Sequence, residues 1–155
     1  MTKNSTQPSC VLCETDGGLV IWSGPTCRVI DANDPNHTGL TRVVWSAHIA
    51  EMTDLTTEHQ LFIMQVVLTV EKVMREHLNP LKINLASLGN FVSHLHWHVI
   101  PRWANDASFP DSIWSLATRT TDQTAARRSA TGALLPTYHD RLREKLTSDF
   151  GDSKV

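Results

Sequence analysis

The sequence lacks the features that would direct a protein to a membrane, a secretory route or a nucleic acid. The 155 residues contain no run of roughly 18 or more apolar residues, the length that a membrane-spanning helix needs. Residues 1–9 are polar and lack the apolar core of a signal peptide, and we expect them to be disordered. The net charge of −2 argues against a nucleic-acid-binding surface, which is usually basic. We therefore predict a cytoplasmic protein without a membrane or nucleic-acid partner.

Internal repeats, a low-complexity linker and a glycine-rich phosphate loop of the P-loop type are also missing. A length of 155 residues then predicts one domain with a single core. The composition, with 41% hydrophobic and 19% charged residues, is typical of a soluble globular chain. There are three cysteines, and in a reducing cytoplasm we expect no disulfide among them.

The most informative segment is residues 93–102, which reads Ser-His-Leu-His-Trp-His-Val-Ile-Pro-Arg. Three of the eight histidines lie here at a spacing of two, and side chains two apart share one face of a β-strand. His94, His96 and His98 are therefore predicted to form one row, while the apolar residues between them cover a core. Because Pro101 has no backbone N–H, we expect the strand to run from residue 91 to about residue 100.

A row of three imidazoles suits some chemistries better than others. The outer two α-carbons lie roughly 13 Å apart along a strand, which is far for three ligands of one zinc ion with bonds to nitrogen of about 2 Å. An extended polar substrate, such as a chain of phosphates, matches the row better. Histidine can act near neutral pH as a nucleophile, a proton donor or a neutral hydrogen-bond partner. The alternative is a chance surface cluster, which brings no structural gain to an otherwise apolar strand.

The segment resembles the signature of the histidine triad (HIT) family of nucleotide hydrolases and transferases. Residues 94–100 fit the alternating pattern at every position, and the resemblance covers roughly residues 10–103. It implies an α+β fold: an antiparallel β-sheet meander with one long helix packed on it and a C-terminal helix. We expect a HIT domain over residues 10–103 and an extension over residues 104–155 that packs on the same domain. The resemblance also implies a homodimer and a purine nucleotide substrate.

In this family the middle histidine attacks the α-phosphate and forms a covalent nucleotidyl-histidine. By resemblance His96 is the nucleophile, and His98 binds the phosphate oxygens or the leaving group. His94 then orients its neighbours or binds zinc. The implied function is cleavage of a nucleoside phosphoanhydride or phosphoramidate bond, as in a dinucleoside polyphosphate hydrolase or phosphorylase, including one acting on diadenosine tetraphosphate.

The resemblance also implies substrate-binding residues outside the row. Asn84 and Asn90 are implied to contact phosphate, although a buried structural amide explains Asn84 equally well. An acidic residue in the loop of residues 31–38 is implied to contact the ribose. Asp31 and Asp34 are both suitable, the spacing does not choose between them, and ordinary turn formation is an equal alternative; Asp34 is our candidate.

Two positions depart from the family pattern. A histidine near the phosphates usually follows the glycine of the upstream strand, but Leu40 follows Gly39 here. His37 is close in sequence without matching that position. Phe91 stands where a Ser or Thr is common, so one hydroxyl donor is lost. These differences keep a non-catalytic nucleotide-binding or metal-binding protein as the alternative to an enzyme.

Cys10 and Cys13 form a C-x-x-C pair. Such a pair is a metal half-site, a redox pair or two free thiols packed as small hydrophobes. A closed zinc site needs two more ligands, and the resemblance suggests His48 and His94. We therefore expect a structural zinc ion as the alternative to free thiols, and no cofactor that the chemistry requires.

The rest of the pattern predicts the elements around this row. Strands are expected over residues 19–22, 27–30, 39–45 and 81–86. Residues 56–78 carry an apolar stripe at three- and four-residue spacing, which predicts one long helix. Asp54 or Thr56 can cap this helix, and Asn79 followed by Pro80 should end it. A closing amphipathic helix is predicted over residues 136–146, with Pro136 near its first turn.

Overall fold

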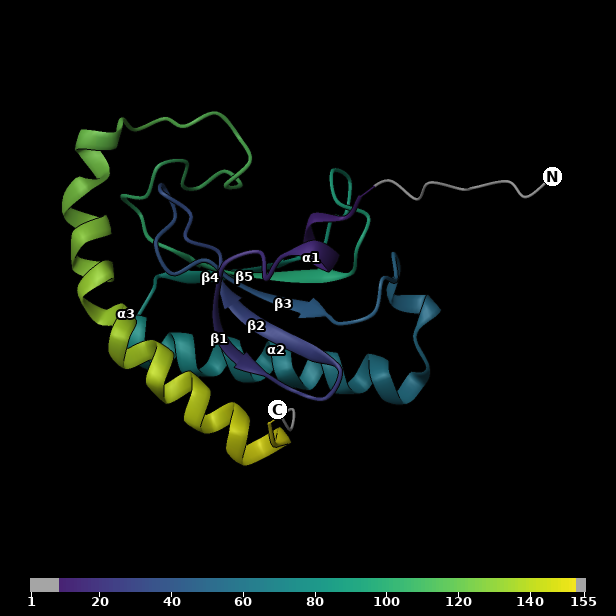
Figure 1. The fold of residues 1–155 in the computed structure, drawn as a ribbon. Helices are drawn as coiled ribbons and strands as arrows, with labels where there is room; N and C mark the ends of the chain where they lie inside the picture. The colour runs from purple at the N-terminus through teal and green to yellow at the C-terminus, as the bar shows by residue number, and fades with distance from the viewer. Residues whose placement is uncertain (1–8, 153–155) are drawn as a thin grey trace.

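The computed structural model describes residues 9–152 and contains a five-stranded sheet with helices on both sides (Figure 1). Residues 1–8, where we predicted disorder, lie outside the described residues, as do residues 153–155. In chain order the elements are α1 (Val11–Glu14), β1 (Leu19–Ser23), β2 (Cys27–Asp31), β3 (Thr41–Trp45), the 3-10 helix η1 (Met52–Asp54), α2 (Thr57–Leu78), β4 (Lys82–Ala86), β5 (His96–Arg102) and α3 (Thr121–Phe150).

The sheet is antiparallel throughout and has the strand order β1-β2-β3-β5-β4. The first three strands form a meander, and the chain then passes through α2 to β4 at the far edge. The last strand, β5, returns between β3 and β4. The predicted α+β fold, an antiparallel sheet with one long helix and a C-terminal helix, is confirmed. Because β5 lies inside the sheet, its histidines have a neighbouring strand on each side.

The long helix α2 has a capping residue at each end and a buried apolar stripe between them. The Thr56 hydroxyl accepts a hydrogen bond from the backbone N–H of His59 at 3.3 Å and caps the first turn. Asn79 ends the helix in the left-handed conformation, with φ of 46°, directly before Pro80. The predicted helix is therefore confirmed, and its cap is Thr56 rather than Asp54. The buried stripe consists of Ile63, Val66, Val67, Val70, Val73, Met74 and Leu78.

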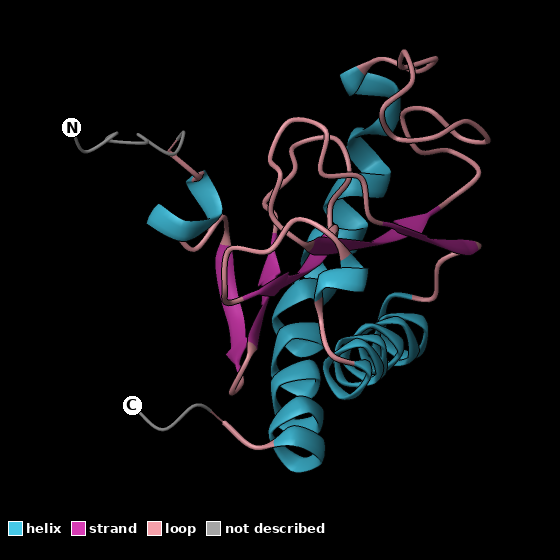
Figure 2. Cartoon of the chain, turned by 90° about the vertical axis from the view of Figure 1, so that its right-hand side faces the viewer, coloured by secondary structure: helices cyan, strands magenta, loops and turns pink. Residues whose placement is uncertain are grey.

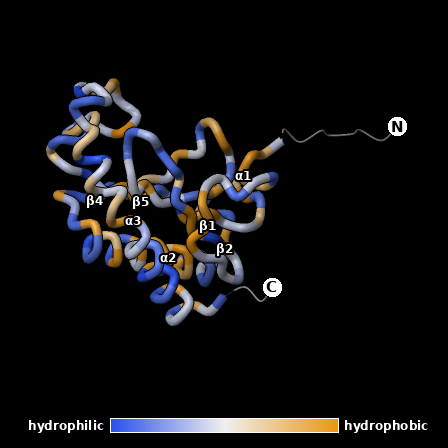
Figure 3. Tube along the Cα trace, turned by 60° about the vertical axis from the view of Figure 1, so that its left-hand side comes forward, coloured by the Kyte–Doolittle hydropathy of each residue, from blue (hydrophilic) through white to orange (hydrophobic). Residues whose placement is uncertain are grey.

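The main core lies between one face of the sheet and the two long helices. Figures 1 and 2 show α2 running beneath the sheet and the C-terminal half of α3 lying beside it. In Figure 3 apolar stretches gather on β1 and β2 near the middle of the molecule. The core includes Ile21, Val29, Val43 and Val99 from the strands and Tyr138, Leu142 and Leu146 from α3. A second, smaller cluster of Leu12, Ile30 and Val44 places α1 over the opposite face.

β5 differs from the prediction at both ends. It begins at His96 rather than at residue 91, and it continues through Pro101 to Arg102. The pairing between β3 and β5 ends two residues before Pro101, so the missing N–H removes no bond from that ladder. At the other end, His94 lies in a bend before the strand instead of inside it. The expectation that the proline would end the strand was therefore wrong.

The closing helix α3 begins much earlier than the predicted residue 136. It starts at Thr121 behind a capping box at Thr120, and Pro136 lies in its interior rather than in its first turn. Interior prolines bend helices, and Figure 1 shows α3 as a bent helix that runs down one side of the molecule and turns beneath it. Its first half buries Thr124 and Thr131 instead of an apolar stripe, so no periodic signal marked it. No helix within residues 9–152 combines the length and the apolarity needed to cross a membrane.

Candidate active site and metal cluster

The face of the sheet opposite α2 carries the polar residues of the site. Residues paired directly across antiparallel strands point to the same face. The register pairs His98 of β5 with Arg42 of β3 on one side and with Ala86 of β4 on the other. Side chains two residues further along a strand share that face, which adds His96 of β5 and Asn84 of β4. Three strands therefore contribute polar side chains to one surface.

His96 is held in one orientation by the backbone. Its Nδ1 lies 2.6 Å from the carbonyl oxygen of His94. A carbonyl oxygen only accepts hydrogen bonds, so Nδ1 carries the proton and Nε2 of the neutral ring keeps its lone pair. Burial lowers the pKa of His96, with a smaller contribution from the charge of Arg42 in the same direction, while the bond to the His94 carbonyl opposes both. The neutral imidazole, which is the nucleophilic form, is therefore the form present at neutral pH.

His98 packs between His96 and an aromatic residue of the following loop. The ring centroids of His96 and His98 are 4.9 Å apart, and those of His98 and Trp114 are 5.2 Å apart. Burial, followed by the charges of His96 and Arg42, lowers the pKa of His98 to about 4. Its Nδ1 is buried and has no hydrogen-bond partner among the described residues. His98 is therefore neutral at neutral pH and keeps one ring nitrogen unpaired.

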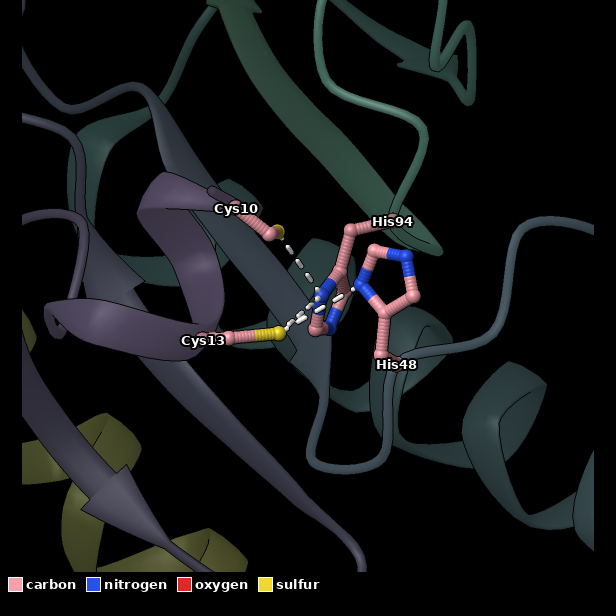
Figure 4. A group of neighbouring side chains, drawn as sticks. All are labelled: Cys10, Cys13, His48 and His94. Carbon is pink, nitrogen blue, oxygen red and sulfur yellow. Dashed lines mark hydrogen bonds between the residues drawn. The ribbon is translucent and has the colours of Figure 1, made fainter. Parts of the chain in front are cut away.

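His94 lies just before β5, and its ring contacts the cysteines of α1 (Figure 4). Its Nε2 lies 2.6 Å from the carbonyl oxygen of Trp45 and so carries the proton. The unprotonated Nδ1 faces the Sγ atoms of Cys10 and Cys13, at 3.4 Å from each. A carbonyl on the far ring nitrogen is the arrangement that orients metal-binding histidines. The predicted row of three is therefore divided between two neighbouring sites.

The structure brings together the four residues that the sequence suggested as metal ligands. The ligand atoms of Cys10, Cys13, His48 and His94 all lie within 4.8 Å of one another. Figure 4 shows the two thiols and the two imidazoles directed at one point. A tetrahedral zinc ion with bonds of about 2.3 Å to sulfur and 2.0 Å to nitrogen places sulfur about 3.5 Å from nitrogen. The three sulfur–nitrogen distances of 3.4 Å are close to this value, so the donors and their spacing fit such an ion.

Asn84 is fixed by a buried arginine at the end of β5. Nη1 of Arg102 donates a hydrogen bond to Oδ1 of Asn84 at 2.8 Å, which turns the amide NH₂ of Asn84 away from Arg102. Arg102 is 1% exposed, and Asp106 binds it at two points, with Nε–Oδ2 and Nη2–Oδ1 distances of 2.7 and 3.1 Å. Burial opposes ionisation of Asp106, but Arg102 and backbone N–H donors lower its pKa overall. The NH₂ group of Asn84 is thus a fixed donor on the site face.

The two aspartates that were considered for a ribose contact, Asp31 and Asp34, differ in exposure and in hydrogen-bond partners. Oδ1 of Asp34 accepts hydrogen bonds from the backbone N–H groups of Asn36 and His37, at 2.9 and 2.8 Å. A further hydrogen bond from the His37 ring is the largest cause that lowers the pKa of Asp34 to about 2. Asp31 is buried and lies 3.0 Å from Nε2 of His139, so it serves the packing of α3. Of the two aspartates, Asp34 has the more exposed side chain.

The two positions that depart from the family pattern supply no other group that could bind phosphate. Leu40 is 1% exposed and belongs to the core. His37 is buried and contacts Asp34 through Nδ1 at 3.2 Å. Phe91 and the adjacent Asn90 are exposed in the loop before β5, and the Phe91 ring is fully exposed. Because Phe91 has no hydroxyl group, the residue next to Asn90 offers no second donor for a phosphate.

Sequence reasoning missed Arg42 and Asp106. Arg42 is a single charged residue in a strand that is otherwise apolar apart from Thr41, which is a weak signal. Its place beside His98 depends on the pairing of β3 with β5, which one sequence does not reveal. Asp106 follows Arg102 by four residues, but ion pairs at that spacing are common and carry no functional information by themselves.

Comparisons with known proteins agree with this geometry. The family model described as HIT domain matches residues 17–105, more than half of the chain. The chain therefore belongs to the HIT family.

Solved structures of this family share the fold. A histidine triad protein of Sinorhizobium meliloti 1021 is 24% identical, with a TM-score of 0.63, and the match covers 85% of this chain and 97% of that one. One from Marinobacter aquaeolei VT8 is 25% identical, with a TM-score of 0.60 and coverage of 79% and 92%. A zinc-bound family protein of Mycobacterium smegmatis is 22% identical, with a TM-score of 0.55 and coverage of 83% and 97%.

Curated relatives with a stated activity are also found. Two strains of Mycobacterium tuberculosis have an AP-4-A phosphorylase that is 32% identical to this chain over 98 residues. The match covers 59% of this chain and 50% of the relative. The chain thus spans about half the length of the curated relatives it matches.

The low pKa of His98 predicts a specific loss of stability in acid. The folded chain keeps His98 neutral down to a pKa of about 4, whereas the unfolded chain protonates it near its ordinary value of 6.5. The unfolded state therefore binds more protons between these values, and the free energy of unfolding falls as the pH decreases. From pH 7 to pH 5 the contribution of His98 to this loss is about 2 kcal/mol.

Urea unfolding of the wild type and His98→Gln at both pH values measures this contribution. His98→Gln should lose less stability on acidification than the wild type, by about that amount. His77→Gln, on α2, is the control for removing an imidazole outside the site. An identical pH dependence in the wild type and His98→Gln would contradict the low pKa.

Proposed function

We propose that the chain is a nucleotide hydrolase or transferase that cleaves a nucleoside phosphoanhydride or phosphoramidate bond through a covalent nucleotidyl-His96. The observation that carries this proposal is the hydrogen bond of 2.6 Å from Nδ1 of His96 to the His94 carbonyl. It leaves a lone pair on Nε2 of a ring that packs against His98. Membership of the HIT family and the phosphorylase relatives support a nucleotide-processing enzyme as the class.

The reaction would consist of two displacements at the α-phosphorus. In the first, Nε2 of His96 forms a bond to phosphorus, the bond from phosphorus to the leaving atom breaks, and its electron pair departs with the leaving group. In the second, an oxygen of water or another acceptor attacks phosphorus, and the electron pair of the N–P bond returns to Nε2. Water then yields a nucleoside monophosphate and releases a proton, whereas inorganic phosphate yields a nucleoside diphosphate.

Two fixed groups would assist these displacements. The His98 ring, which packs against that of His96, can bind a phosphate oxygen or the leaving group, and the NH₂ of Asn84 can donate to a second oxygen. Donors that are already oriented stabilise the charge of the transition state without reorganisation. Asn90 and Asp34 are further proposed contacts, the former to phosphate and the latter to ribose.

A dinucleoside polyphosphate is the proposed substrate class, with a purine base. The support is the similarity to AP-4-A phosphorylase over 98 residues. Hydrolase and phosphorylase differ only in the acceptor, so turnover with and without added inorganic phosphate distinguishes them. A nucleotide-binding or metal-binding protein without turnover is the second candidate, favoured by the buried Leu40 at the usual histidine position and by Phe91 at the usual hydroxyl position.

Replacement of His96 by Ala should abolish the covalent intermediate. Diadenosine tetraphosphate labelled at the α-phosphate and quenched at alkaline pH should leave label on the wild type, and acid should release it because N–P bonds are acid-labile. His96→Ala should carry no label and lose several orders of magnitude in turnover, if covalent catalysis supplies most of the rate. The apolar side of β5 is unchanged in this variant, so the fold should be retained.

His77→Ala, on the opposite layer of the molecule, is the matched control and should keep both label and turnover. Near-normal turnover in His96→Ala would exclude His96 as the nucleophile. A wild type that releases no product from any dinucleoside polyphosphate or phosphoramidate tested, yet gains thermal stability with nucleotide, would favour the binding protein.

The cluster of Cys10, Cys13, His48 and His94 is proposed to bind one structural zinc ion. Its donor set and spacing support this assignment, and one related structure is a zinc-bound HIT protein. When bound, the ion would supply no chemistry to the reaction and would cross-link α1 and the segment after β3 to the bend before β5. That bend presents the His94 carbonyl that orients His96.

Elemental analysis of protein purified without chelator should find about one zinc ion per chain. The double variant Cys10→Ser, Cys13→Ser removes both thiolate ligands and should contain none. Cys27→Ala, which alters a cysteine buried in the core, should keep the metal. Equal zinc content in the double variant and the wild type would exclude these ligands, and its absence from the wild type would leave two free thiols.

A homodimer is proposed from the family resemblance and from exposed apolar residues. Leu81 and Leu85 on and beside the edge strand β4 are 64% and 36% exposed, and Leu68 of α2 is 52% exposed. Edge strands and apolar helix faces are common two-fold contact surfaces.

Light scattering at micromolar concentration should give about twice the chain mass of 17.3 kDa. Leu85→Lys should shift the protein toward the monomer, because a charge on an edge strand opposes pairing. Leu134→Lys, on α3, should leave the mass unchanged. A wild type that stays monomeric at high concentration would reject the dimer.

A further inference from the structure

Two residues of β3 pair with the histidines of β5: Val44 with His96, and Arg42, the charged one, with His98. In the sheet Arg42 pairs with Ile30 of β2 on one side and with His98 of β5 on the other. Directly paired residues share a face, so Arg42 and His98 are side by side on the site face. Its charge acts on both imidazoles, because it lowers the pKa of His96 and of His98.

Arg42 differs from the other arginines of this face in having no partner. Its Nε is inaccessible to solvent and has no hydrogen-bond partner among the described residues. Arg28, by contrast, donates to three backbone carbonyls, and Arg102 forms a bidentate pair with Asp106. A buried guanidinium nitrogen without a hydrogen-bond partner lowers the stability of the folded state. The presence of Arg42 at this position therefore needs an explanation.

The nearest acidic group does not provide that partner. Asp34 is close enough to raise the pKa of Arg42, while burial lowers it and is the larger effect. No hydrogen bond or ion pair joins the two within residues 9–152, and Oδ1 of Asp34 already accepts three bonds from its own loop. The positive charge of Arg42 therefore forms no ion pair within residues 9–152.

Position 40 carries no side chain that can bind a phosphate. The family pattern expects an imidazole there, near the phosphates, but Leu40 is buried. Leu40 directly precedes β3, and Arg42, the second residue of that strand, lies two positions further along the chain. A guanidinium group is longer than an imidazole and can reach over the strand from that position.

We propose that Arg42 binds the non-bridging oxygens of the nucleotide phosphate held at His96 and His98, in place of the histidine that is missing at position 40. This inference rests on the proposed nucleotide chemistry. A guanidinium group presents several N–H donors in one plane, which matches the oxygens of a phosphate, and it stays charged at neutral pH. A bound phosphate would give the guanidinium group an acceptor, which it lacks among the described residues, and the fixed cation would stabilise the charge of the transition state.

The test compares the binding of AMP and of adenosine, which differ by the phosphate alone. Isothermal titration calorimetry of the wild type should show tighter binding of AMP. In Arg42→Met the affinity for AMP should fall by about 10- to 100-fold, since charge-assisted hydrogen bonds to the phosphate are lost. The affinity for adenosine should stay within about twofold of the wild type. Arg42→Lys keeps the charge without the planar donors and should be intermediate.

Arg75→Met is the matched control, because it removes the same charge from the exposed side of α2. It should keep the wild-type preference for AMP. Stability provides a second readout that separates binding from a structural role. Removing an unpartnered, desolvated guanidinium should leave the urea midpoint of Arg42→Met unchanged or raised, whereas a structural arginine would lower it on removal.

The outcomes distinguish this inference from the proposed reaction. An Arg42→Met variant that keeps the wild-type preference for AMP overturns the inference, even when the wild type turns over dinucleoside polyphosphate. Equal losses of AMP and adenosine affinity together with a lowered urea midpoint also overturn it, as does a wild type with no preference for AMP. A selective loss of AMP affinity supports the inference even in a chain that proves to have no turnover, in which case the proposed reaction fails alone.

Discussion

The hydrogen bond between Nδ1 of His96 and the carbonyl oxygen of His94 connects the proposed catalytic residues to the candidate metal cluster. It determines which nitrogen of His96 carries the proton, and its direction depends on the bend that contains His94. That bend is held by the last residue of β3 and by the segment after it. The Leu95 N–H donates to the Ile49 carbonyl at 2.6 Å, and the Trp45 N–H donates to the Leu95 carbonyl at 3.1 Å. Backbone hydrogen bonds at the residue after His94 thus fix the carbonyl that sets the tautomer of the proposed nucleophile, without a side-chain partner.

The position of β5 inside the sheet determines what surrounds the two imidazoles. On one side β3 provides Arg42, and on the other β4 provides Ala86 directly opposite His98. The small side chain of Ala86 leaves the face beside His98 uncovered by β4, while Asn84, two residues away, presents its NH₂ group. A strand at the edge of the sheet would have had only one such neighbour. The order β3-β5-β4 therefore assembles cation, imidazoles and amide from three separate parts of the chain.

Features that depend on local sequence were predictable, and features that depend on strand pairing were not. The helix α2 carries its own caps and its own apolar stripe, so its bounds followed from residues 56–80. The four candidate zinc ligands were suggested by the C-x-x-C spacing with the family resemblance, and the structure places them together. The first half of α3 packs through Thr124 and Thr131, which carry no periodic signal. Arg42 lies beside His98 only because β3 pairs with β5, which is far along the chain, so its proposed role could not be predicted from its neighbours in sequence.

A comparison of Arg102 with Arg42 shows that burial alone does not distinguish a structural charge from a functional one. Arg102 is the more buried of the two, yet each of its three nitrogens has an acceptor, and Asp106 in turn accepts from the N–H groups of Ser108 and Phe109. Such a bidentate pair offsets its desolvation and fixes the loop that places Trp114 against His98. Arg42 is less buried but has no acceptor, so its desolvation is not offset within the described chain. The two arginines are therefore distinguished by their hydrogen bonds and not by their depth of burial. This difference supports a structural role for Arg102 and the proposed phosphate-binding role for Arg42.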